Sequence, residues 1–140
     1  MRILMMGGTR FIGVYLTKIL AAQGHEVVLF NRGNKPVPVS GVKQIQGDRT
    51  NVDQLKEKLS TEEFDVVFDN NGRELSDTKP LAEIFKGRVK HFVYMSSAGV
   101  YLKSDQMPHI EGDATDPKSR HLGKCETENY LASAGLPWTS

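Results

Sequence analysis

The amino-acid sequence predicts an α/β domain in which helices cover both faces of a doubly wound parallel sheet. Short apolar runs alternate with segments of helical periodicity, which is the pattern of repeated strand-helix-strand units. The run at residues 64–68 is almost wholly apolar, as in a strand buried on both faces of a parallel sheet. The 140 residues suffice for one domain, so we expect a single unit over residues 1–140.

The predicted elements follow in a regular order. Strands are expected at residues 3–6, 26–30, 42–46, 64–68 and 89–95. Helices are expected at residues 11–20, 52–59, around 81–85 and at 119–134, from the spacing of their apolar residues. Residues 101–117 are polar and irregular, and residues 138–140 read as the opening of a further strand. We therefore expect the chain to be the N-terminal part of a longer protein, truncated before its last strands.

Composition excludes several classes of protein. A hydrophobic content of 39% and a charged content of 25% are ordinary for a globular domain and unlike a disordered, collagenous or coiled-coil chain. The formal net charge of +1 provides no overall field for nucleic acid or an anionic membrane, so any nucleic-acid site must be a local patch. No apolar run reaches the roughly 18 residues of a membrane span.

The single cysteine, Cys125, fits a reducing compartment, and we expect a cytoplasmic protein without membrane association. The four histidines and Cys125 show no ligand spacing, so no metal site is predicted.

A glycine motif lies where the first predicted strand turns into the first predicted helix. It consists of Gly7, Gly8, Thr9, Arg10, Phe11, Ile12 and Gly13. Gly7 permits a tight turn, Gly13 allows close packing of helix on strand, and the N–H groups at the helix start favour a pyrophosphate. A glycine triplet alone is weak evidence, but its position between strand and helix predicts a dinucleotide-binding site rather than a plain turn.

Residues near the ends of the next two strands indicate which dinucleotide binds. Arg10 stands where the motif usually has its middle glycine, and Asn31 and Arg32 stand where an acidic residue would bind the ribose 2′-OH of NAD. Two arginines without a carboxylate suit the 2′-phosphate of NADP, so NADP is predicted, with NAD as the alternative. The arginines can also be read as solvated surface residues. Asp48 is either an adenine contact or a turn residue.

Several longer motifs resemble the atypical extended short-chain dehydrogenase/reductases, closest to the chloroplast stem-loop binding protein group and its cyanobacterial relatives. The motifs are the glycine motif, Asn71-Gly72-Arg73-Glu74, the segment from Ser96 to Asp105, and the segment from Asp116 to Lys124. The resemblance implies a Rossmann NAD(P)-binding domain, followed in the family by a C-terminal substrate domain. It also adds Asn71 and Lys124 to the expected cofactor-binding residues.

In extended dehydrogenases and epimerases, a Ser or Thr and a Tyr-x-x-x-Lys pair move the proton that accompanies hydride transfer. Ser97 and Lys124 match this pattern, but Arg120 occupies the tyrosine position. A guanidinium that stays protonated cannot replace a phenol as acid and base, which argues against classical redox catalysis. Tyr101 is the alternative phenol, although it is expected on the loop after the strand.

The resemblance further implies binding and endonucleolytic cleavage of stem-loop RNA. Acid/base cleavage of RNA needs a base, an acid and cations, and Arg120, His121, Lys124 and His109 are candidates for these roles. The basic residues near the last helix also fit a solvated helix start. Lys86, Arg88, Lys90 and His91 form a second candidate cluster for phosphate contacts, although charges that flank a strand also fit an ordinary surface.

Two activities therefore stay open: RNA processing, and the chemistry of an NAD(P)-dependent nucleotide-sugar epimerase or dehydratase. We expect homo-oligomers or association with a ribonucleoprotein, in the cytoplasm or the plastid stroma.

Overall fold

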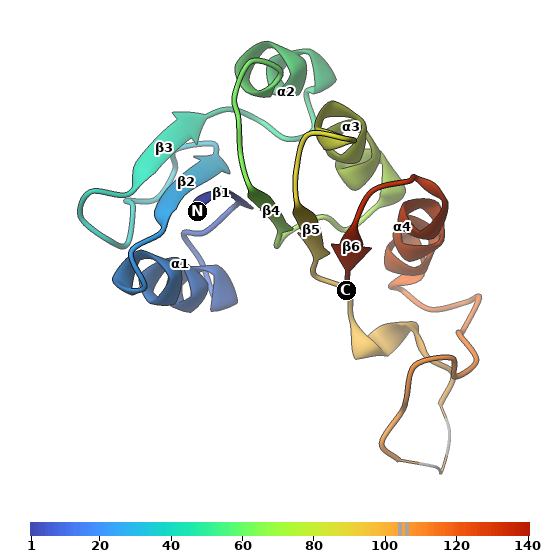
Figure 1. Ribbon diagram of the computed structural model, residues 1–140. Helices are drawn as coiled ribbons and strands as arrows, with labels where there is room; N and C mark the ends of the chain where they lie inside the picture. The colour runs from blue at the N-terminus through green and yellow to red at the C-terminus, as the bar shows by residue number, and fades with distance from the viewer. Residues whose placement is uncertain (104, 106) are drawn as a thin grey trace.

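A computed structural model describes every residue of the chain except 104 and 106. Six parallel strands form one sheet in the order β3-β2-β1-β4-β5-β6 (Figure 1). The strands are β1 Arg2–Met6, β2 Glu26–Asn31, β3 Lys43–Gln46, β4 Val66–Asp69, β5 His91–Tyr94 and β6 Trp138–Thr139. The helices are α1 Ile12–Ala22, α2 Val52–Leu59, α3 Leu75–Phe85 and α4 Leu122–Ser133, with a short 3-10 helix η1 at Ala98–Val100.

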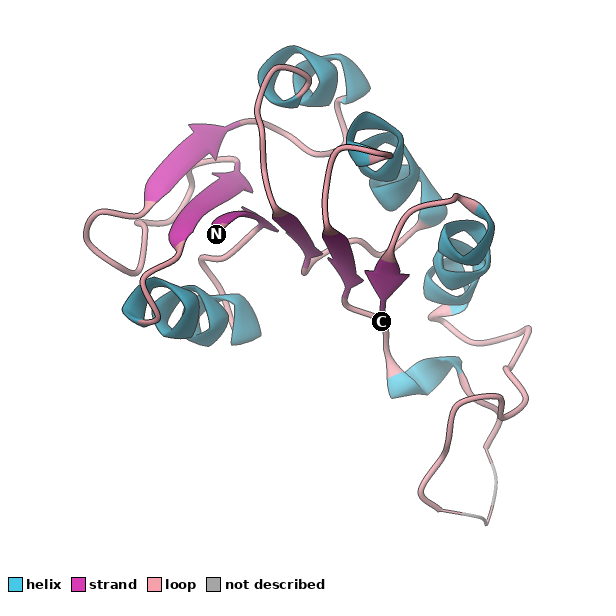
Figure 2. Cartoon of the chain, viewed as in Figure 1, coloured by secondary structure: helices cyan, strands magenta, loops and turns pink. Residues whose placement is uncertain are grey.

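The helices lie on both faces of the sheet. Helices α2, α3 and α4 lie along one face, and α1 covers the other face beside β1 and β2 (Figure 2). The larger core joins Leu4 and Phe30 of the sheet to Leu55 of α2, Leu81 of α3 and Leu131 of α4. A smaller core forms where α1 packs on the opposite side of β1 and β2. This arrangement confirms the doubly wound parallel fold.

The chain changes direction across the sheet between β1 and β4. Strands β2 and β3 lie on one side of β1, and β4, β5 and β6 follow on the other side. In open parallel sheets, ligands bind beyond the carboxyl ends of the strands at this point of reversal. The fold therefore places a crevice next to the turn that follows β1.

The five predicted strands are confirmed, with ends that shift by a few residues. The expected strand opening at residues 138–140 is also present, because Trp138 pairs with Phe92 and Thr139 with Val93. Helix α3 begins earlier than the apolar spacing indicated, since Glu74 and Asp77 form a capping box at its start. Helix α4 begins at Leu122, later than predicted, because Ser119 donates its hydroxyl to Gly99 O at 2.6 Å.

The described residues between Tyr101 and Asp116 form an excursion that leaves the sheet at the lower right of Figure 1. Tyr101 and Thr115 pair at its base in an antiparallel bridge, and Leu102 N donates to Ala114 O. His109 stacks on the ring of Tyr101 with centroids 5.1 Å apart. Ser104, part of the motif from Ser96 to Asp105, lies outside the described residues. Among the helices that the structure describes, none has the length and apolarity to cross a bilayer.

Candidate functional site

A cavity of about 710 Å³ lies beyond the carboxyl ends of the strands, at the reversal point of the sheet. It is lined by the glycine turn, the end of β2 and the segments that follow β3 and β4. Ten of the twelve predicted cofactor residues line it: Gly7, Gly8, Thr9, Arg10, Phe11, Ile12, Asn31, Arg32, Asp48 and Asn71. Gly13 and Lys124 are not part of the lining.

The glycine turn owes its shape to backbone conformations that favour glycine. Gly7 and Gly8 have φ angles of 95° and 84°, in the left-handed region. A Cβ atom on Gly13 would lie 3.0 Å from Gly8 Cα, so helix α1 approaches the turn as closely as a glycine allows. No side chain caps the start of α1 at Phe11. Gly13 N and Val14 N already donate to Arg10 O and Phe11 O, so what the helix start offers the cavity, which Phe11 and Ile12 line, is chiefly the positive end of its dipole.

The end of β2 is joined to the glycine turn by Asn31. Its side-chain Nδ2 donates to Gly7 O at 3.2 Å, while its Oδ1 accepts from Gly33 N at 2.8 Å. Both halves of the amide are thus occupied by backbone partners, and Asn31 shapes the wall of the cavity. The adjacent Arg32 is exposed and lines this cavity together with a neighbouring one of about 480 Å³.

Asp48 lies in the cavity wall and also builds the turn that leads into α2. Its Oδ1 accepts from Thr50 N at 3.0 Å and from Thr50 Oγ1 at 2.8 Å. These two hydrogen bonds, with a smaller contribution from the positive charge of Arg32, hold the pKa of Asp48 below its ordinary value. Asp48 is therefore an ionised turn residue whose carboxylate stands beside Arg32.

The residue that sequence reasoning missed is Arg49. Its side chain is only 11% exposed and forms a two-pronged ion pair with the fully buried Asp69, at 2.7 and 3.0 Å. Burial would raise the pKa of Asp69, but the charge of Arg49 and the hydrogen bonds it donates hold that pKa below its ordinary value. The available signal was Asp69 itself, because a carboxylate that ends a buried strand requires a cationic partner.

The catalytic candidates gather beside η1, at the start of α4. Ser97 Oγ accepts from Gly99 N at 3.2 Å. Arg120 Nε donates to His121 Nε2 at 3.1 Å, and since a guanidinium only donates, Nε2 is the unprotonated ring nitrogen of His121. A Cβ on Gly99 would lie 3.0 Å from His121 Nε2 and 3.3 Å from Ser97 Oγ. The structure thus brings Ser97, Arg120 and His121 together.

The side chain of Lys124 makes its hydrogen bonds to backbone oxygens rather than to the side chains of this group. Its Nζ donates to Gly72 O at 2.9 Å and to Met95 O, and it lies 5.1 Å from the ring centre of Tyr94. Burial lowers the pKa of Lys124. Lys124 therefore ties α4 to the turn after β4 and to the end of β5.

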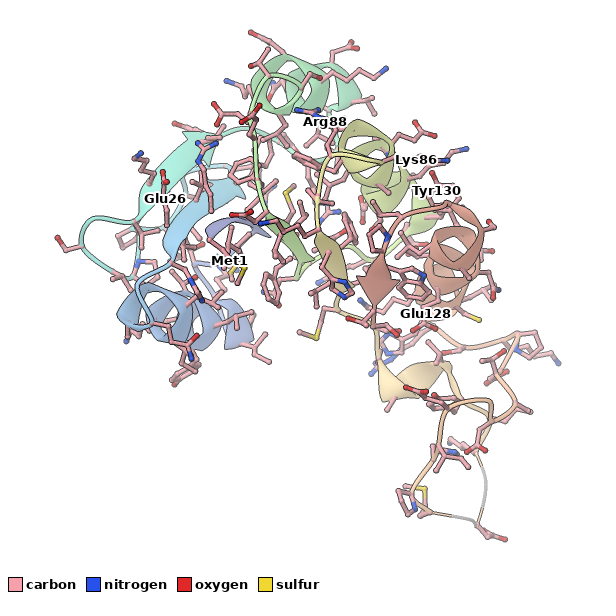
Figure 3. The ribbon with its side chains drawn as sticks, viewed as in Figure 1. Met1, Glu26, Lys86, Arg88, Glu128 and Tyr130 are labelled. Atoms are coloured by element: carbon pink, nitrogen blue, oxygen red, sulfur yellow. The ribbon has the colours of Figure 1, made fainter. Side chains whose placement is uncertain are left out.

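Two groups of predicted nucleic-acid contacts lie elsewhere. His109 pairs with Asp113 at 3.2 Å within the excursion. Lys86, Arg88, Lys90 and His91 precede or begin β5, at the amino ends of the strands, and Figure 3 labels Lys86 and Arg88 beside α3. Arg88 donates to the backbone oxygens of Ile84 and Glu62, and Lys90 pairs with Asp65 at 2.7 Å. Arg88 and Lys90 therefore already have protein partners at the amino edge of the sheet.

The cavity wall is rich in positive charge. Its lining contains five basic residues, Arg10, Arg32, Lys35, Arg49 and Arg73, and two acidic ones, Asp48 and Asp77. The charge of Arg49 is matched by Asp69, so four cations and two carboxylates are left in the lining, an excess of positive charge that suits an anionic ligand. In the part of the chain that the structure describes, no cluster of histidine, cysteine or acidic side chains is arranged to hold a metal ion.

Comparison with known proteins agrees with this geometry. Residues 7–140 match the family described as NAD(P)H-binding. The chloroplast stem-loop binding protein of 41 kDa b from Arabidopsis thaliana is 48% identical over 153 residues, and the 2′-dehydrokanamycin reductase of Streptomyces kanamyceticus is 28% identical over 142 residues. The alignments cover 99% and 100% of this chain but 40% of each relative.

Among solved structures, the UDP-glucose 4-epimerase of Thermus thermophilus, in complex with NAD, superimposes with a TM-score of 0.84 at 22% identity. That superposition covers 99% of this chain and 53% of the epimerase, and it shows a shared fold. The chain therefore spans about half or less of the length of the proteins that it matches.

Proposed function

The chain belongs to the NAD(P)H-binding family, and from this premise we propose that its cavity binds NADP in preference to NAD. The observation that carries the proposal is the position of Arg32, which follows β2 directly and lines the cavity. An acidic residue at this place would bind the ribose 2′-OH of NAD, whereas a guanidinium pairs with a 2′-phosphate. Lys35 adds a second cation to the same wall.

The glycine turn is the proposed binding site for the pyrophosphate of the same dinucleotide. Its backbone N–H groups and the uncapped start of α1 lie in the same cavity as Arg32. A helix start of this kind favours a phosphate through hydrogen bonds and through the helix dipole. The dinucleotide would thus extend from Arg32 across the glycine turn towards Asn71 and Arg73.

Binding of NADPH and NADH to the protein, measured by isothermal titration calorimetry, tests this proposal. We expect NADPH to bind more tightly, and Arg32→Ala to weaken NADPH binding about tenfold or more while NADH binding changes little. Lys56→Ala is the matched control, because Lys56 is an exposed cation on α2 outside the cavity lining. Equal affinities for the two dinucleotides, or tighter binding of NADH, would overturn the preference.

We further propose that the bound dinucleotide is not turned over by the tyrosine-dependent proton transfer of extended dehydrogenases. Arg120 stands at the tyrosine position, and its guanidinium is bonded to His121. The competing function is that of a nucleotide-sugar epimerase or dehydratase. Turnover of UDP-glucose by the unmodified protein would establish that alternative. Turnover by Arg120→Tyr but not by the unmodified protein would show that the tyrosine phenol is the only catalytic group that is missing.

A second candidate function is RNA binding or cleavage at the group formed by Ser97, Arg120 and His121. One relative is named a stem-loop binding protein, and the unprotonated Nε2 of His121 is the form of imidazole that acts as a base. The Nε2 lone pair accepts from Arg120, so Arg120 would first turn to a phosphate group, and the freed Nε2 would then take the proton of an RNA 2′-OH.

Incubation with a labelled stem-loop RNA at several salt concentrations separates the outcomes. We expect retention that weakens with salt, and loss of any cleavage in Arg120→Ala/His121→Ala but not in Lys86→Ala. Retention without cleavage would favour an assembly role, with homo-oligomers or ribonucleoprotein association. Absence of retention would eliminate RNA as a ligand of this chain. We place the function in the cytoplasm or the plastid stroma, and the name of the Arabidopsis relative supports the plastid.

A further inference from the structure

The ion pair between Arg49 and Asp69 forms the inner wall of the cavity beside Asn71. Arg49 follows β3 by three residues, and Asp69 ends β4. Both Nη atoms of Arg49 donate to the Asp69 carboxylate, and Nη2 also donates to Asp77 O at 2.9 Å. The carboxylate accepts two more hydrogen bonds, from Gly72 N at 3.0 Å and from Thr78 Oγ1 at 2.6 Å.

Stability alone gives a weak reason for such a pair. Removing two charges from water offsets much of their attraction, and an apolar pair of similar volume often serves stability as well or better. Arg49 Nε is buried and has no hydrogen-bond partner among the described residues, which adds to the cost. The presence of a buried ion pair at this position is therefore better explained by the residue that the pair holds in place.

Asn71 is the residue that the pair holds at the cavity. Arg49 Nη1 donates to Asn71 Oδ1. Because a guanidinium has donors only, the atom of Asn71 that faces it must be the oxygen, and the amide cannot be turned over without placing two donors against each other. The NH2 group of Asn71 consequently points the other way, towards Gly7, where a Cβ would lie 3.3 Å from Nδ2.

We infer that Arg49 is a positioning residue for the dinucleotide. Its hydrogen bond to Asn71 Oδ1 orients the NH2 group of Asn71 towards an acceptor oxygen of the bound ligand. The inference rests on the proposed binding of a dinucleotide. Gly7 and Asn71 both line the cavity, so the donor stands beside the turn where the pyrophosphate and its adjoining ribose present oxygens. Asp69 holds the guanidinium, and the guanidinium holds the amide.

The same pair also fixes the turn after β4. Asp69 accepts from Gly72 N, and Gly72 O in turn accepts from Lys124 Nζ. There is no room for a side chain at this turn, because a Cβ on Gly72 would lie 2.8 Å from Asp69 Oδ2. Asn71 is therefore held from two directions: through its side chain by Arg49, and through its backbone by the neighbouring turn.

A double-mutant cycle on Arg49 and Asn71, read as NADPH affinity, tests the inference. In Arg49→Lys the ammonium can still pair with Asp69, but a single nitrogen cannot reproduce the planar fork that also reaches Asn71. We expect Arg49→Lys and Asn71→Ala each to weaken NADPH binding about tenfold or more. In the combined variant we expect little further loss, because both changes remove the same hydrogen bond to the ligand.

A structural role and a positioning role are separated by a second variant. Arg49→Met/Asp69→Asn removes both charges together and leaves an amide that can accept from Gly72 N and donate to Thr78 Oγ1, so we expect its urea midpoint to stay near that of the unmodified protein while NADPH binding is still weakened about tenfold. Arg88→Met is the matched control, because Arg88 also donates to backbone oxygens but lies at the amino edge of the sheet. It should change stability without changing NADPH affinity.

The outcomes distinguish this inference from the proposed function. If the unmodified protein binds neither NADPH nor NADH, the proposed function itself fails. If the unmodified protein binds NADPH and Arg49→Lys binds it equally well, only the role of Arg49 is overturned. Fully additive losses in Arg49→Lys and Asn71→Ala would also overturn it, since the two residues would then act independently. Comparing NADPH binding by the unmodified protein and by Arg49→Lys requires only that this single variant folds. The inference can therefore be overturned even if a double variant misfolds.

Discussion

Gly13 packs against Gly8 so closely that a Cβ atom on Gly13 would lie 3.0 Å from the Cα and 3.1 Å from the N of Gly8. The contact joins the first turn of α1 to the glycine turn that lines the cavity. The side-chain Nδ2 of Asn70 would lie 2.8 Å from the same Cβ, but the two Gly8 atoms belong to the backbone, so rotating a side chain cannot by itself open the space. The distance between helix and turn is therefore set by the absence of a side chain at Gly13.

Gly13→Ala is expected to destabilise the protein by about 1–3 kcal/mol, as overpacking of a dense interior does, and to weaken NADPH binding by moving the turn. Gly24→Ala is the control, because Gly24 follows the same helix with a φ of 79° but has open space where a Cβ would lie. Urea unfolding and NADPH titration should show reduced stability in both variants and lost affinity only in Gly13→Ala. Unchanged affinity in Gly13→Ala would contradict the prediction.

Acid is expected to weaken the fold through Asp69. The pKa of Asp69 is held below its ordinary value, so its contribution is present above the pKa of the unfolded chain, near the ordinary 3.8. That stability is lost as the pH falls through the lower pKa of the folded state. In Asp69→Asn, which leaves the Arg49 charge without its partner, stability at pH 7 should fall by about 3–5 kcal/mol.

The comparison is made by urea unfolding at a series of pH values below about 5. The difference in stability between Asp69→Asn and the unmodified protein should shrink as the pH falls below 3.8. A difference that stays constant over this range would show that Asp69 does not titrate with a lowered pKa.

Alkali is expected to act through Tyr94. Burial raises the pKa of Tyr94 to about 12 from an ordinary value of 10.0. A raised folded-state pKa means that the stability contributed by the phenol is complete below pH 10 and declines as the pH rises towards 12. Tyr94→Phe should lose less stability over this interval than the unmodified protein. In an ultraviolet titration, the phenol that ionises at the highest pH in the unmodified protein should be missing from Tyr94→Phe. If that phenol still titrates in Tyr94→Phe, the assignment to Tyr94 is refuted.

The hydroxyl of Thr78 is expected to contribute more to the free energy of unfolding than an ordinary buried hydroxyl does. Its Oγ1 donates at 2.6 Å to the carboxylate of Asp69, and the residue is fully buried. Hydrogen bonds to charged groups contribute about 1.5–3 kcal/mol, against about 1 kcal/mol for neutral acceptors. Thr78→Val should therefore cost more stability than Thr17→Val, since the equally buried Thr17 donates to the neutral Gly13 O at 2.7 Å. Equal costs in denaturant unfolding would count against a charged acceptor.

Short-range patterns in the sequence were enough to predict the strand and helix order and most of the cavity lining. Hydrophobic periodicity and glycine punctuation act over a few residues, so they placed the glycine turn, Arg32 and Asp48 at the ends of consecutive strands. The carboxyl ends of parallel strands share one edge of the sheet, which is why these residues meet in one cavity. The late start of α4 was missed because Ser119 bonds to Gly99, twenty residues earlier in the chain.

The tertiary structure alone decided which charges are buried and what each donor faces. Arg49 and Asp69 are 20 residues apart, on segments that follow β3 and end β4, and β2 and β1 lie between those strands. No local spacing encodes such a pair, because it depends on where the crossover through α2 returns the chain. The orientation of the Asn71 amide and the grouping of Ser97 with His121 have the same origin. They are fixed by partners that only the folded sheet brings within hydrogen-bond distance.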